Sequence, residues 1–402
     1  MKQKPECRIL QVFTALGVGG AETWLISLLK YFKEIEDELP VRLKFDICLT
    51  GGFKAALDDE AIALGARLFY LPYTRQKLPS FVRGFRRILR RGRYHAIHDH
   101  QDYTAGLHFL FGLGCLPPVR VVHVHNPLLH LDNYSFSPLR RVTLSVGRNL
   151  LARLATHIMG TSKQILREYE FDTPQFHAIE RGAAYCGFDV TRFRGDYQQV
   201  HAELCQEFAW NESAKILLFI GRLGTNQKNP RVALGIARAC VARNPDVRLL
   251  MAGAGDNERA EFENLIKSWG LQTEIRLLGV RSDVPRLMQG CDLLLFPSLA
   301  EGLGMVAVEA QAAGLRVLSS DAVPRECVVL PEMVRFESLQ SDVLVWAEQA
   351  LQMLNAPLPD AAACNLAVRN SAFSIENSAA RLLEIYSAGI QNGQPESLKR
   401  TS

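Results

Sequence analysis

The segment from Phe296 to Asp321, FPSLAEGLGMVAVEAQAAGLRVLSSD, constrains the fold more than any other part of the chain. An apolar strand at 293–296 leads into a turn, the turn opens a helix that should reach Ala313, and a second apolar strand follows at 315–318. This order predicts two parallel strands joined by a crossover helix. Residues 298–304 should therefore lie at the carboxyl end of a parallel strand, where such sheets bind ligands.

Two glutamates bracket the start of this helix. Glu301 lies in the turn, Glu309 lies more than one helical turn inside, and Gly302 and Gly304 leave the backbone bare between them. Free N–H groups at the positive end of a helix suit a phosphate. An ionised carboxylate only accepts hydrogen bonds, so a glutamate on each side suits sugar hydroxyls. The alternative is an ordinary helix start with an acidic residue near the helix dipole.

A second glycine-rich turn lies near the N-terminus. An apolar strand at 8–14 is followed by Gly17, Gly19 and Gly20, and then by apolar residues at helical spacing. Such a turn lets the backbone approach an anion closely. Because Glu22 stands where G-x-G-x-x-G requires its last glycine, a dinucleotide site is disfavoured. A tight strand-to-helix turn without a ligand is the alternative.

Strand and helix patterns alternate along the whole chain and predict a doubly wound α/β protein with right-handed crossovers. The expected strands of the first half lie at 43–49, 67–71, 96–100, 119–124 and 157–160. The 402 residues suffice for two or three domains, each with its own core. Polar and charged residues dominate 191–212, which we expect to be the linker between two domains.

Composition and charge argue against several classes of protein. A net charge of +4 does not indicate nucleic acid binding. The nine cysteines form no C-x-x-C pair, which predicts a reduced, cytoplasmic protein with buried thiols. No stretch approaches the roughly 20 apolar residues of a membrane span, and the N-terminus lacks the apolar core of a signal peptide.

The segment 75–93 carries eight basic residues and no acidic one. Phe81, Phe85 and Leu89 share one face of the helix expected there. A basic amphipathic helix can lie on an anionic membrane, here the inner face of the plasma membrane. An ordinary crossover helix needs the same apolar face, so both interpretations stay open. A second expected helix, at 138–156, adds four arginines.

Histidines gather at the ends of two expected strands. His125 ends the apolar run of VRVVHVHNP, and strand alternation places His123 on the same side. A zinc site is disfavoured because no carboxylate or cysteine stands at a matching spacing. Asp99, Asp102 and the loop at 126–137 are candidates to face a second substrate.

Two cations follow the buried strand expected at 215–221. Arg222 offers a fork for bidentate contacts, and Lys228 offers a mobile point charge. Both should lie at a strand end, near the anticipated phosphate. Asn229 and Asp283 are expected to cap helices.

PSLAEGLGMVAVEAQAAGLRV, with its Glu-x7-Glu spacing, resembles the donor-site motif of retaining GT-B glycosyltransferases of group 1, or family 4 type. It is similar above all to the branch with bacterial capsule and exopolysaccharide enzymes. GVGGAE and VHVHN resemble the N-terminal loop and the strand-end histidine of the same family. The resemblance covers nearly the whole chain and implies two Rossmann-like doubly wound domains facing across a cleft. One departure is Cys186, where relatives usually carry asparagine.

The resemblance also implies roles. Glu309 would hold the ribose hydroxyls, and Glu301 the 3- and 4-hydroxyls of the transferred sugar. His125 would contact that sugar near its primary hydroxyl. Arg222 and Lys228 would neutralise the leaving diphosphate. The implied catalytic residues are Glu301, His125, Arg222 and Lys228. The implied donor-binding residues are Gly19, Gly20, Arg222, Lys228, Gly279, Val280, Glu301, Gly302, Leu303, Gly304, Met305, Val306 and Glu309.

The implied organisation is an acceptor-side domain at 1–190 and a donor domain at 213–373, with a last helix at 374–388 packing back on the first domain. The implied reaction is retaining transfer of a hexosyl or N-acetylhexosaminyl unit from a nucleotide diphosphate sugar, with UDP preferred. The acceptor would be a glycan or polyprenyl-linked molecule of cell-surface polysaccharide synthesis. No metal or cofactor is expected.

Two other classes stay open. A nucleotide-sugar epimerase or hydrolase could use the same double fold. A non-catalytic partner subunit that only binds a nucleotide sugar would keep the glycines but could dispense with Lys228 and His125.

Overall fold

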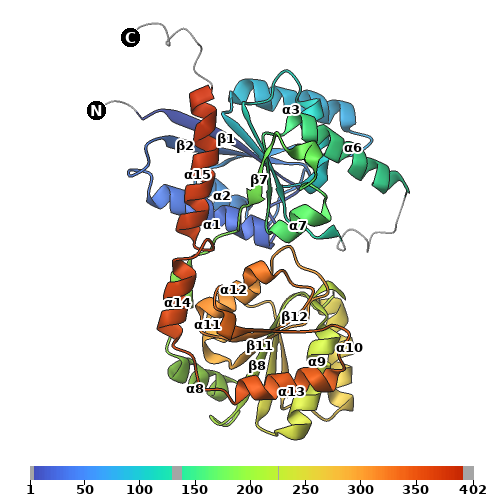
Figure 1. Cartoon of the computed structure of the whole chain (residues 1–402), viewed down its shortest axis with the longest axis vertical. Coiled ribbons are helices and arrows are strands. Elements are labelled where there is room, and N and C mark those ends of the chain that lie inside the picture. The colour runs from blue at the N-terminus through green and yellow to red at the C-terminus, as the bar shows by residue number, and fades with distance from the viewer. Residues whose placement is uncertain (1–3, 129–137, 225, 393–402) are drawn as a thin grey trace. The chain divides into compact units, whose positions relative to one another are not determined.

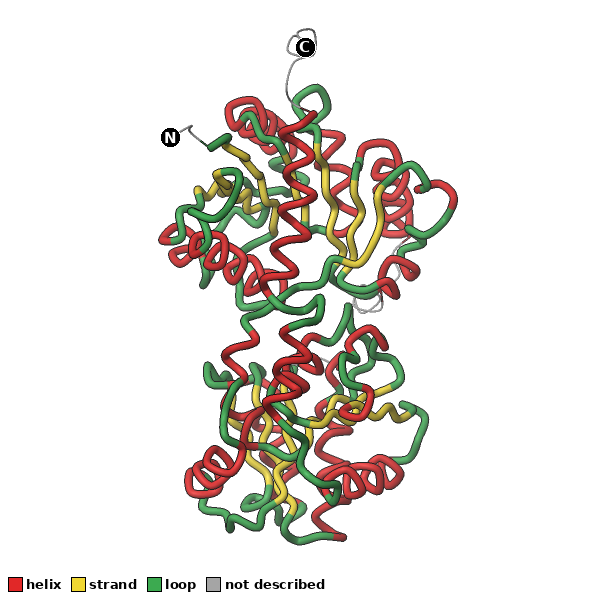
Figure 2. The backbone as a smooth tube through the Cα atoms, turned by 60° about the vertical axis from the view of Figure 1, so that its left-hand side comes forward, coloured by secondary structure: helices red, strands yellow, loops and turns green. Residues whose placement is uncertain are grey.

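The computed structural model describes residues 4–128, 138–224 and 226–392, and the chain divides into two compact units. Unit 1 is Met1–Phe188 together with Ile375–Ser402, and unit 2 is Asp189–Ser374 (Figure 1). Each described unit is a parallel sheet with helices on its faces (Figures 1 and 2). This confirms the predicted two-domain, doubly wound α/β fold.

Unit 1 contains a seven-stranded parallel sheet in the order β3-β2-β1-β4-β5-β6-β7. Its strands are β1 (Glu6–Phe13), β2 (Arg42–Leu49), β3 (Arg67–Tyr70), β4 (Ala96–Asp99), β5 (Val119–Val124), β6 (His157–Gly160) and β7 (Glu180–Ala183). The strand order reverses between β1 and β4. The carboxyl ends of these two strands therefore form a topological switch point, the usual ligand position in such sheets.

The helices of unit 1 fall into two groups around this sheet. The described helices of unit 1 are α1 (Gly20–Glu34), α2 (Asp58–Ala63), α3 (Leu78–Gly92), α4 (Ala105–Phe111), α6 (Pro138–Leu154), α7 (Lys163–Glu168) and α15 (Ile375–Asn392), with short turns η1 (Asp102–Thr104) and η2 (Pro174–Phe176). Helices α3, α4, α6 and α7 bury an apolar core on one face. Helices α1 and α15 contact each other, and α15 contacts β1 and β5.

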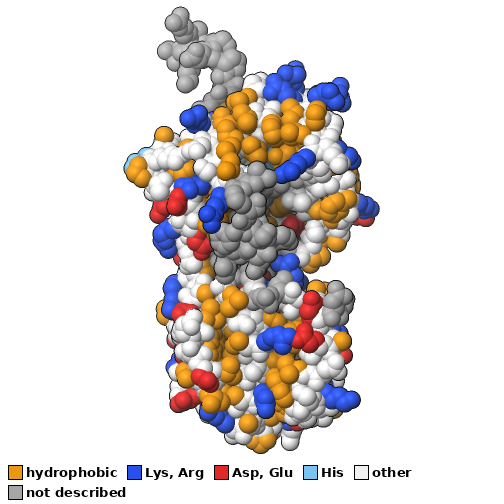
Figure 3. Space-filling model, turned by 90° about the vertical axis from the view of Figure 1, so that its right-hand side faces the viewer, with side chains coloured by type: hydrophobic (Ala, Val, Ile, Leu, Met, Phe, Trp, Pro, Cys, Tyr) orange, Lys and Arg blue, Asp and Glu red, His pale blue; other side chains and the backbone are white. Residues whose placement is uncertain are grey.

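Helix α3 uses its apolar face inside the protein. Phe81 and Phe85 are fully buried, and Leu89 nearly so, in the core with strands β1, β4 and β5. The structure thus favours the crossover-helix interpretation of the basic segment. The face of the molecule toward α3 and α6 shows Lys and Arg beside exposed hydrophobic side chains (Figure 3). Among the described helices, none combines the length and apolar character that crossing a membrane requires.

Unit 2 contains a six-stranded parallel sheet in the order β10-β9-β8-β11-β12-β13. Its strands are β8 (Lys215–Ile220), β9 (Val247–Ala252), β10 (Ile275–Gly279), β11 (Leu293–Phe296), β12 (Arg316–Ser320) and β13 (Val334–Glu337). Its described helices and turns are η3 (Val190–Phe193), α8 (Tyr197–Glu207), η4 (Asn226–Lys228), α9 (Pro230–Arg243), α10 (Asp256–Ser268), α11 (Val284–Gly290), α12 (Met305–Ala312), η5 (Arg325–Cys327), η6 (Pro331–Met333), α13 (Val343–Leu354) and α14 (Ala361–Arg369). The order reverses between β8 and β11, so this unit also has a switch point.

The segment 191–212, expected as a linker, instead begins unit 2 as folded structure. It contains α8, which packs against α11. Asp196 caps α8 by accepting hydrogen bonds from two backbone N–H groups, and Leu204 and Cys205 belong to the buried face of the helix. The polar residues that suggested a linker belong to the outer face of this helix.

Candidate functional site

The switch point of unit 2 brings together two loops, one after β8 and one after β11. Leu299 N–H donates to the Gln227 carbonyl over 2.7 Å, and Gln227 Nε2 donates to the Ala300 carbonyl over 2.9 Å. Lys228 Nζ lies 2.6 Å from Glu301 Oε1. These contacts hold a lysine and a glutamate at the position where α/β sheets bind ligands.

The Lys228–Glu301 ion pair is largely shielded from solvent. Glu301 is 8% exposed, and the lysine ammonium also lies 5.4 Å from the centre of the Phe296 ring. A desolvated charge is costly without its partner. Any ligand that separates these two groups must therefore offer an anion to the lysine and hydrogen-bond donors to the glutamate.

Glycine is required where the second loop enters α12. Gly304 has φ +94°, and a Cβ there would lie 3.0 Å from both Phe296 and Val323. Gly304 is the N-cap residue, and within the described residues α12 has no side-chain cap. Ala307 N–H already donates to the Gly304 carbonyl over 2.9 Å. The N–H groups of Met305 and Val306 are thus the ones left for a ligand, with the positive end of the helix dipole behind them.

Glu309 lies one turn inside α12 and is partly exposed. Burial raises the pKa of its carboxyl group to about 7, while Arg192 and Lys228 act in the opposite direction. Lys228 therefore interacts with both glutamates of the Glu-x7-Glu motif. Arg192, from η3, was not anticipated as part of this site.

The other predicted residues of unit 2 lie at neighbouring strand ends. Arg222 follows β8 and is exposed. Gly279 ends β10 with φ +67°, and Val280 behind it is 74% exposed. Strand β9 separates β10 from β8 in the sheet.

Asp283 and Asn229 were predicted to cap helices with their side chains, and neither side chain does so. Asp283 occupies the N-cap position of α11, but its carboxylate binds Arg281 and Arg286 instead of the helix backbone. Asn229 precedes α9 in a left-handed conformation, φ +55°, and its side chain makes no capping hydrogen bond. In both cases another backbone or charge interaction determines where the side chain goes.

In unit 1 the glycine turn and the histidines meet through α1. Gly19 is the N-cap residue of α1, and a Cβ there would collide with the Glu22 carboxylate. One turn later, Trp24 lies 5.2 Å from the His123 ring and 6.2 Å from the His125 ring, measured between centroids. Gly20 opens the helix with no heavy atom within 4 Å of its Cβ position.

His125 directly follows β5 and is partly exposed. Its backbone N–H donates to Asp102 Oδ1 over 2.9 Å, and Asn126 Nδ2 donates to Asp102 Oδ2 over 3.2 Å. Asp102 itself has φ +49°, and burial raises its pKa to about 6. Asp102 thus holds the strand end in place.

Asp99 is not available to a substrate, contrary to expectation. It is fully buried, and its carboxylate accepts hydrogen bonds from His108 Nδ1 at 2.7 Å and from Gln101 N–H at 3.0 Å. The expected acceptor loop at 126–137 lies outside the described residues from 129 onward.

Four histidines cluster between β1, β4 and β5: His98, His100, His123 and His125. Their nearest ligand atoms, with Cys186, lie within 4.8 Å in two groups of three. Imidazole lone pairs lie in the ring plane, whereas the His98 ring is inclined only 6° to His123 and 29° to His100. Such stacked rings do not converge on one ion, so we propose no metal for the group of His98, His100 and His123.

Sequence reasoning placed His100 among the strand-end histidines but missed two residues of this cluster region, Gln11 and Tyr386. Gln11 was detectable as the one polar residue within the apolar run ILQVF. Tyr386 lies 375 residues away from Gln11 along the chain, and no local pattern connects them.

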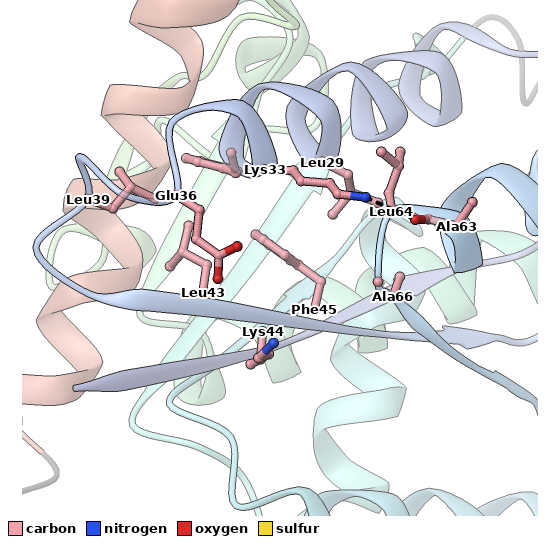
Figure 4. Close-up of a pocket in the computed structure, with 12 residues that line it drawn as sticks. Leu29, Lys33, Glu36, Leu39, Leu43, Lys44, Phe45, Ala63, Leu64 and Ala66 are labelled. Carbon is pink, nitrogen blue, oxygen red and sulfur yellow. Dashed lines mark hydrogen bonds between the residues drawn. The ribbon is translucent and has the colours of Figure 1, made fainter. Parts of the chain in front are cut away.

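A separate cavity of about 210 Å³ lies between α1, the start of β2 and the end of α2 (Figure 4). It is lined mainly by apolar side chains, and Lys33 Nζ donates to the Ala63 carbonyl across it. It borders residues 43–45, at the amino-terminal half of β2, away from the strand ends that hold the candidate residues. We assign it no role.

Two doubly wound parallel sheets in one chain, each with polar side chains near its switch point, are typical of the GT-B fold. The crystal structure of Anabaena HepE in complex with UDP and glucose has this fold. It aligns with a TM-score of 0.74 at 18% identity and covers 95% of this chain and 100% of HepE.

The family follows from sequence comparison. Residues 201–354 match the family model described as "Glycosyl transferases group 1". Residues 42–176 match the one described as "Glycosyl transferase 4-like domain". Glycosyltransferase EpsF of Bacillus subtilis is 27% identical over 94% of this chain and 96% of its own. The UDP-Gal:alpha-D-GlcNAc-diphosphoundecaprenol alpha-1,3-galactosyltransferase of Escherichia coli is 24% identical over 75% of this chain and 78% of its own. The chain is a GT-B glycosyltransferase that resembles the group 1 enzymes of capsule and exopolysaccharide synthesis, as its sequence motifs indicated.

Proposed function

We propose that this glycosyltransferase moves a hexosyl or N-acetylhexosaminyl unit, with retention of configuration, from a UDP-sugar to a glycan or polyprenyl-linked acceptor. The product would belong to cell-surface polysaccharide synthesis. HepE supports the choice of UDP because it was solved with UDP and glucose. The Escherichia coli relative supports the acceptor because its name specifies a diphosphoundecaprenol-linked sugar.

The observation that best supports this proposal is the shielded Lys228–Glu301 pair beside the uncapped start of α12. A sugar diphosphate satisfies both partners at once. Its phosphate oxygens replace Glu301 on the ammonium, and its sugar hydroxyls donate to the carboxylate thus released. Neither charge is then left unpaired.

The same groups would assist departure of the diphosphate. As the bond from the sugar C1 to the phosphate oxygen breaks, negative charge grows on the phosphate. Lys228, Arg222 and the first-turn N–H groups of α12 would stabilise that charge more strongly than the neutral ester oxygen. Glu309 would hold the ribose hydroxyls, Gly279 and Val280 the base, and His125 the transferred sugar.

Retention would follow from attack on the same face from which the phosphate leaves. Among the described residues of this site, Glu301 and Glu309 are both assigned to hydroxyl groups, which leaves neither as nucleophile. The departing phosphate oxygen would take the proton of the acceptor hydroxyl as the new C1–O bond forms. This scheme assigns no step to a metal ion or a cofactor.

The location stays a prediction: a cytoplasmic protein, with α3 and α6 as the surface for an anionic membrane. Arg83, Arg87 and Arg91 of α3 are exposed, whereas its apolar face is buried in the core of unit 1.

Product analysis tests the proposal. The protein is incubated with UDP-sugars, with and without a polyprenyl diphosphate-linked sugar, and the glycosidic linkage is examined by NMR. We expect a new glycoside only with acceptor present, and with the anomeric configuration of the donor. Free sugar or an epimerised nucleotide sugar without acceptor would instead favour the hydrolase or epimerase. Donor binding without any product, across a range of acceptors, would favour the binding subunit.

A further inference from the structure

A continuous chain of hydrogen bonds connects His125 to the C-terminal helix of unit 1. His125 Nε2 lies 2.9 Å from His100 Nδ1, and His100 Nε2 lies 2.8 Å from Gln11 Oε1. Gln11 Nε2 lies 3.0 Å from Tyr386 Oη, which lies 2.6 Å from His98 Nδ1. Apart from the partly exposed His125, every member is buried.

The proton positions along this chain depend on one another. Because the Gln11 amide donates to Tyr386 through Nε2, its Oε1 must accept the Nε2–H of His100. Neutral His100 then has a lone pair at Nδ1, which accepts the Nε2–H of His125. His125 is left with a lone pair at Nδ1. The Tyr386 hydroxyl, which accepts from Gln11, donates its own proton to His98.

The surroundings favour one proton per imidazole ring. Burial lowers the pKa values of His98, His100 and His125 well below the usual histidine value. Cys186 Sγ lies 4.0 Å from His125 Nδ1, and burial raises the pKa of its thiol. A thiol that keeps its proton is a weak donor toward a lone pair, in agreement with the assigned tautomer.

We propose that His100, Gln11 and Tyr386 are positioning residues that fix His125 as its Nε2–H tautomer. His125 Nδ1 can then only accept a hydrogen bond, and a hydroxyl of the transferred sugar would replace the weak Cys186 thiol as its donor. Donor sugars with a hydroxyl at that position would be selected over deoxy analogues. The tautomer concerns unit 1 alone, and only its consequence for sugar choice rests on the proposed function.

The tautomer is measured directly by ¹⁵N NMR of histidine side chains in the ligand-free protein, because protonated and unprotonated ring nitrogens have well-separated shifts. Resonances are assigned by substituting one histidine at a time. We expect His100 and His125 each to carry a single proton, at Nε2. Protonation at Nδ1 of either ring, or rapid exchange between tautomers, would overturn the proposal.

Removal of the Tyr386 hydroxyl by mutation tests the chain of hydrogen bonds. In Tyr386→Phe the Gln11 amide loses its partner and is free to rotate, so we expect a mixture of His125 tautomers. Once the acceptor geometry is lost, kcat/KM for the donor should fall about three- to tenfold, the worth of one hydrogen bond. Gln11→Met should have the same two effects.

The matched control is Tyr94→Phe, which removes a buried hydroxyl of unit 1 that donates to Asp46 over 2.6 Å outside this chain. It should leave the His125 tautomer unchanged. A loss of activity in Tyr386→Phe without a tautomer change would mean a purely structural role and would contradict the proposal. A fixed Nε2–H tautomer in a protein without transferase activity would leave the positioning chain intact and refute the proposed function instead.

Discussion

At the scale of single residues, the proposed donor site depends on the Lys228–Glu301 pair. Both side chains are mostly buried, and each is the other's charge partner. Lys228 also acts to lower the pKa of Glu309, so this one lysine interacts with two glutamates. A dianionic ligand would add to this negative charge, so its binding would also need Arg222 and the positive end of α12.

Replacement of Lys228 should abolish donor binding. At about 100 times its Kd, a UDP-sugar adds about 2.7 kcal/mol to the wild-type stability and raises the melting temperature. In Lys228→Ala this shift should vanish, because the phosphate loses its cation. The exposed Lys267 of α10 provides the control, Lys267→Ala, which should keep the full shift. An undiminished shift in Lys228→Ala would remove this residue from the site.

Donor affinity should depend on pH through Glu309. Its folded-state pKa is raised to about 7, so the carboxylate is ionised, and able to accept two hydroxyl hydrogen bonds, only above that value. Affinity measured by calorimetry should therefore weaken as pH falls below 7, by up to about tenfold per unit. Glu309→Gln should bind weakly and lose this dependence. If the variant keeps the wild-type pH profile, another group is responsible.

The raised pKa of Glu309 also makes the free energy of unfolding depend on pH, in the opposite direction to donor affinity. Between pH about 4.5 and about 7 the folded protein keeps a proton on Glu309 that the unfolded chain releases, so unfolding free energy falls as pH rises through this range. Asp102, with its pKa raised to about 6, acts in the same direction. Binding and stability measurements must for this reason be compared at one pH.

At the scale of elements, the sequence predicts most reliably those strands that consist of continuous buried apolar runs. Strands β5 and β6 lie at the residues expected, because continuous apolar runs specify buried parallel strands. Helix α8 was mistaken for a linker because only one stripe of it is buried. The capping roles of Asn229 and Asp283 failed because φ at Asn229, and the arginines beside Asp283, depend on the surrounding fold.

The entry into α12 should not tolerate a side chain. Gly304→Ala combines a left-handed φ with contacts at 3.0 Å to Phe296 and Val323. We expect a loss of about 2–3 kcal/mol in denaturant unfolding, together with weaker donor binding. Gly270→Ala isolates the backbone cost, because φ there is +71° and no heavy atom lies within 4 Å of the Cβ position. Its loss should be about 1 kcal/mol. Equal losses would refute the steric explanation.

At the scale of the whole molecule, sequence motifs indicated the fold class and the family but not the long-range contacts. Glu301 and Glu309 could be proposed as site residues because a βαβ pattern and a motif surround them. The pairing of Trp24 with Ser378, and of Gln11 with Tyr386, joins the two ends of the chain and depends on the complete sheet. Local sequence contains no signal for such contacts.

Helix α15 should stabilise unit 1 selectively. It packs on α1 and β1, and Trp24 Nε1 donates to Ser378 Oγ over 3.0 Å. A truncation before Ile375 should therefore remove hydrogen-exchange protection from β1, β4 and β5, while β8 and β11 keep theirs. A truncation after Asn392 is the control and should leave both sheets protected. Equal loss in both sheets of the shorter protein would contradict the division into two units.

The central claim is that unit 2 holds the donor diphosphate at its switch point. A crystal structure of the protein with a bound UDP-sugar tests it most directly. We predict phosphate oxygens within hydrogen-bond distance of Lys228 Nζ and of the first-turn N–H groups of α12, with Glu301 released toward the sugar. A diphosphate bound elsewhere, with the Lys228–Glu301 pair intact, would contradict the account.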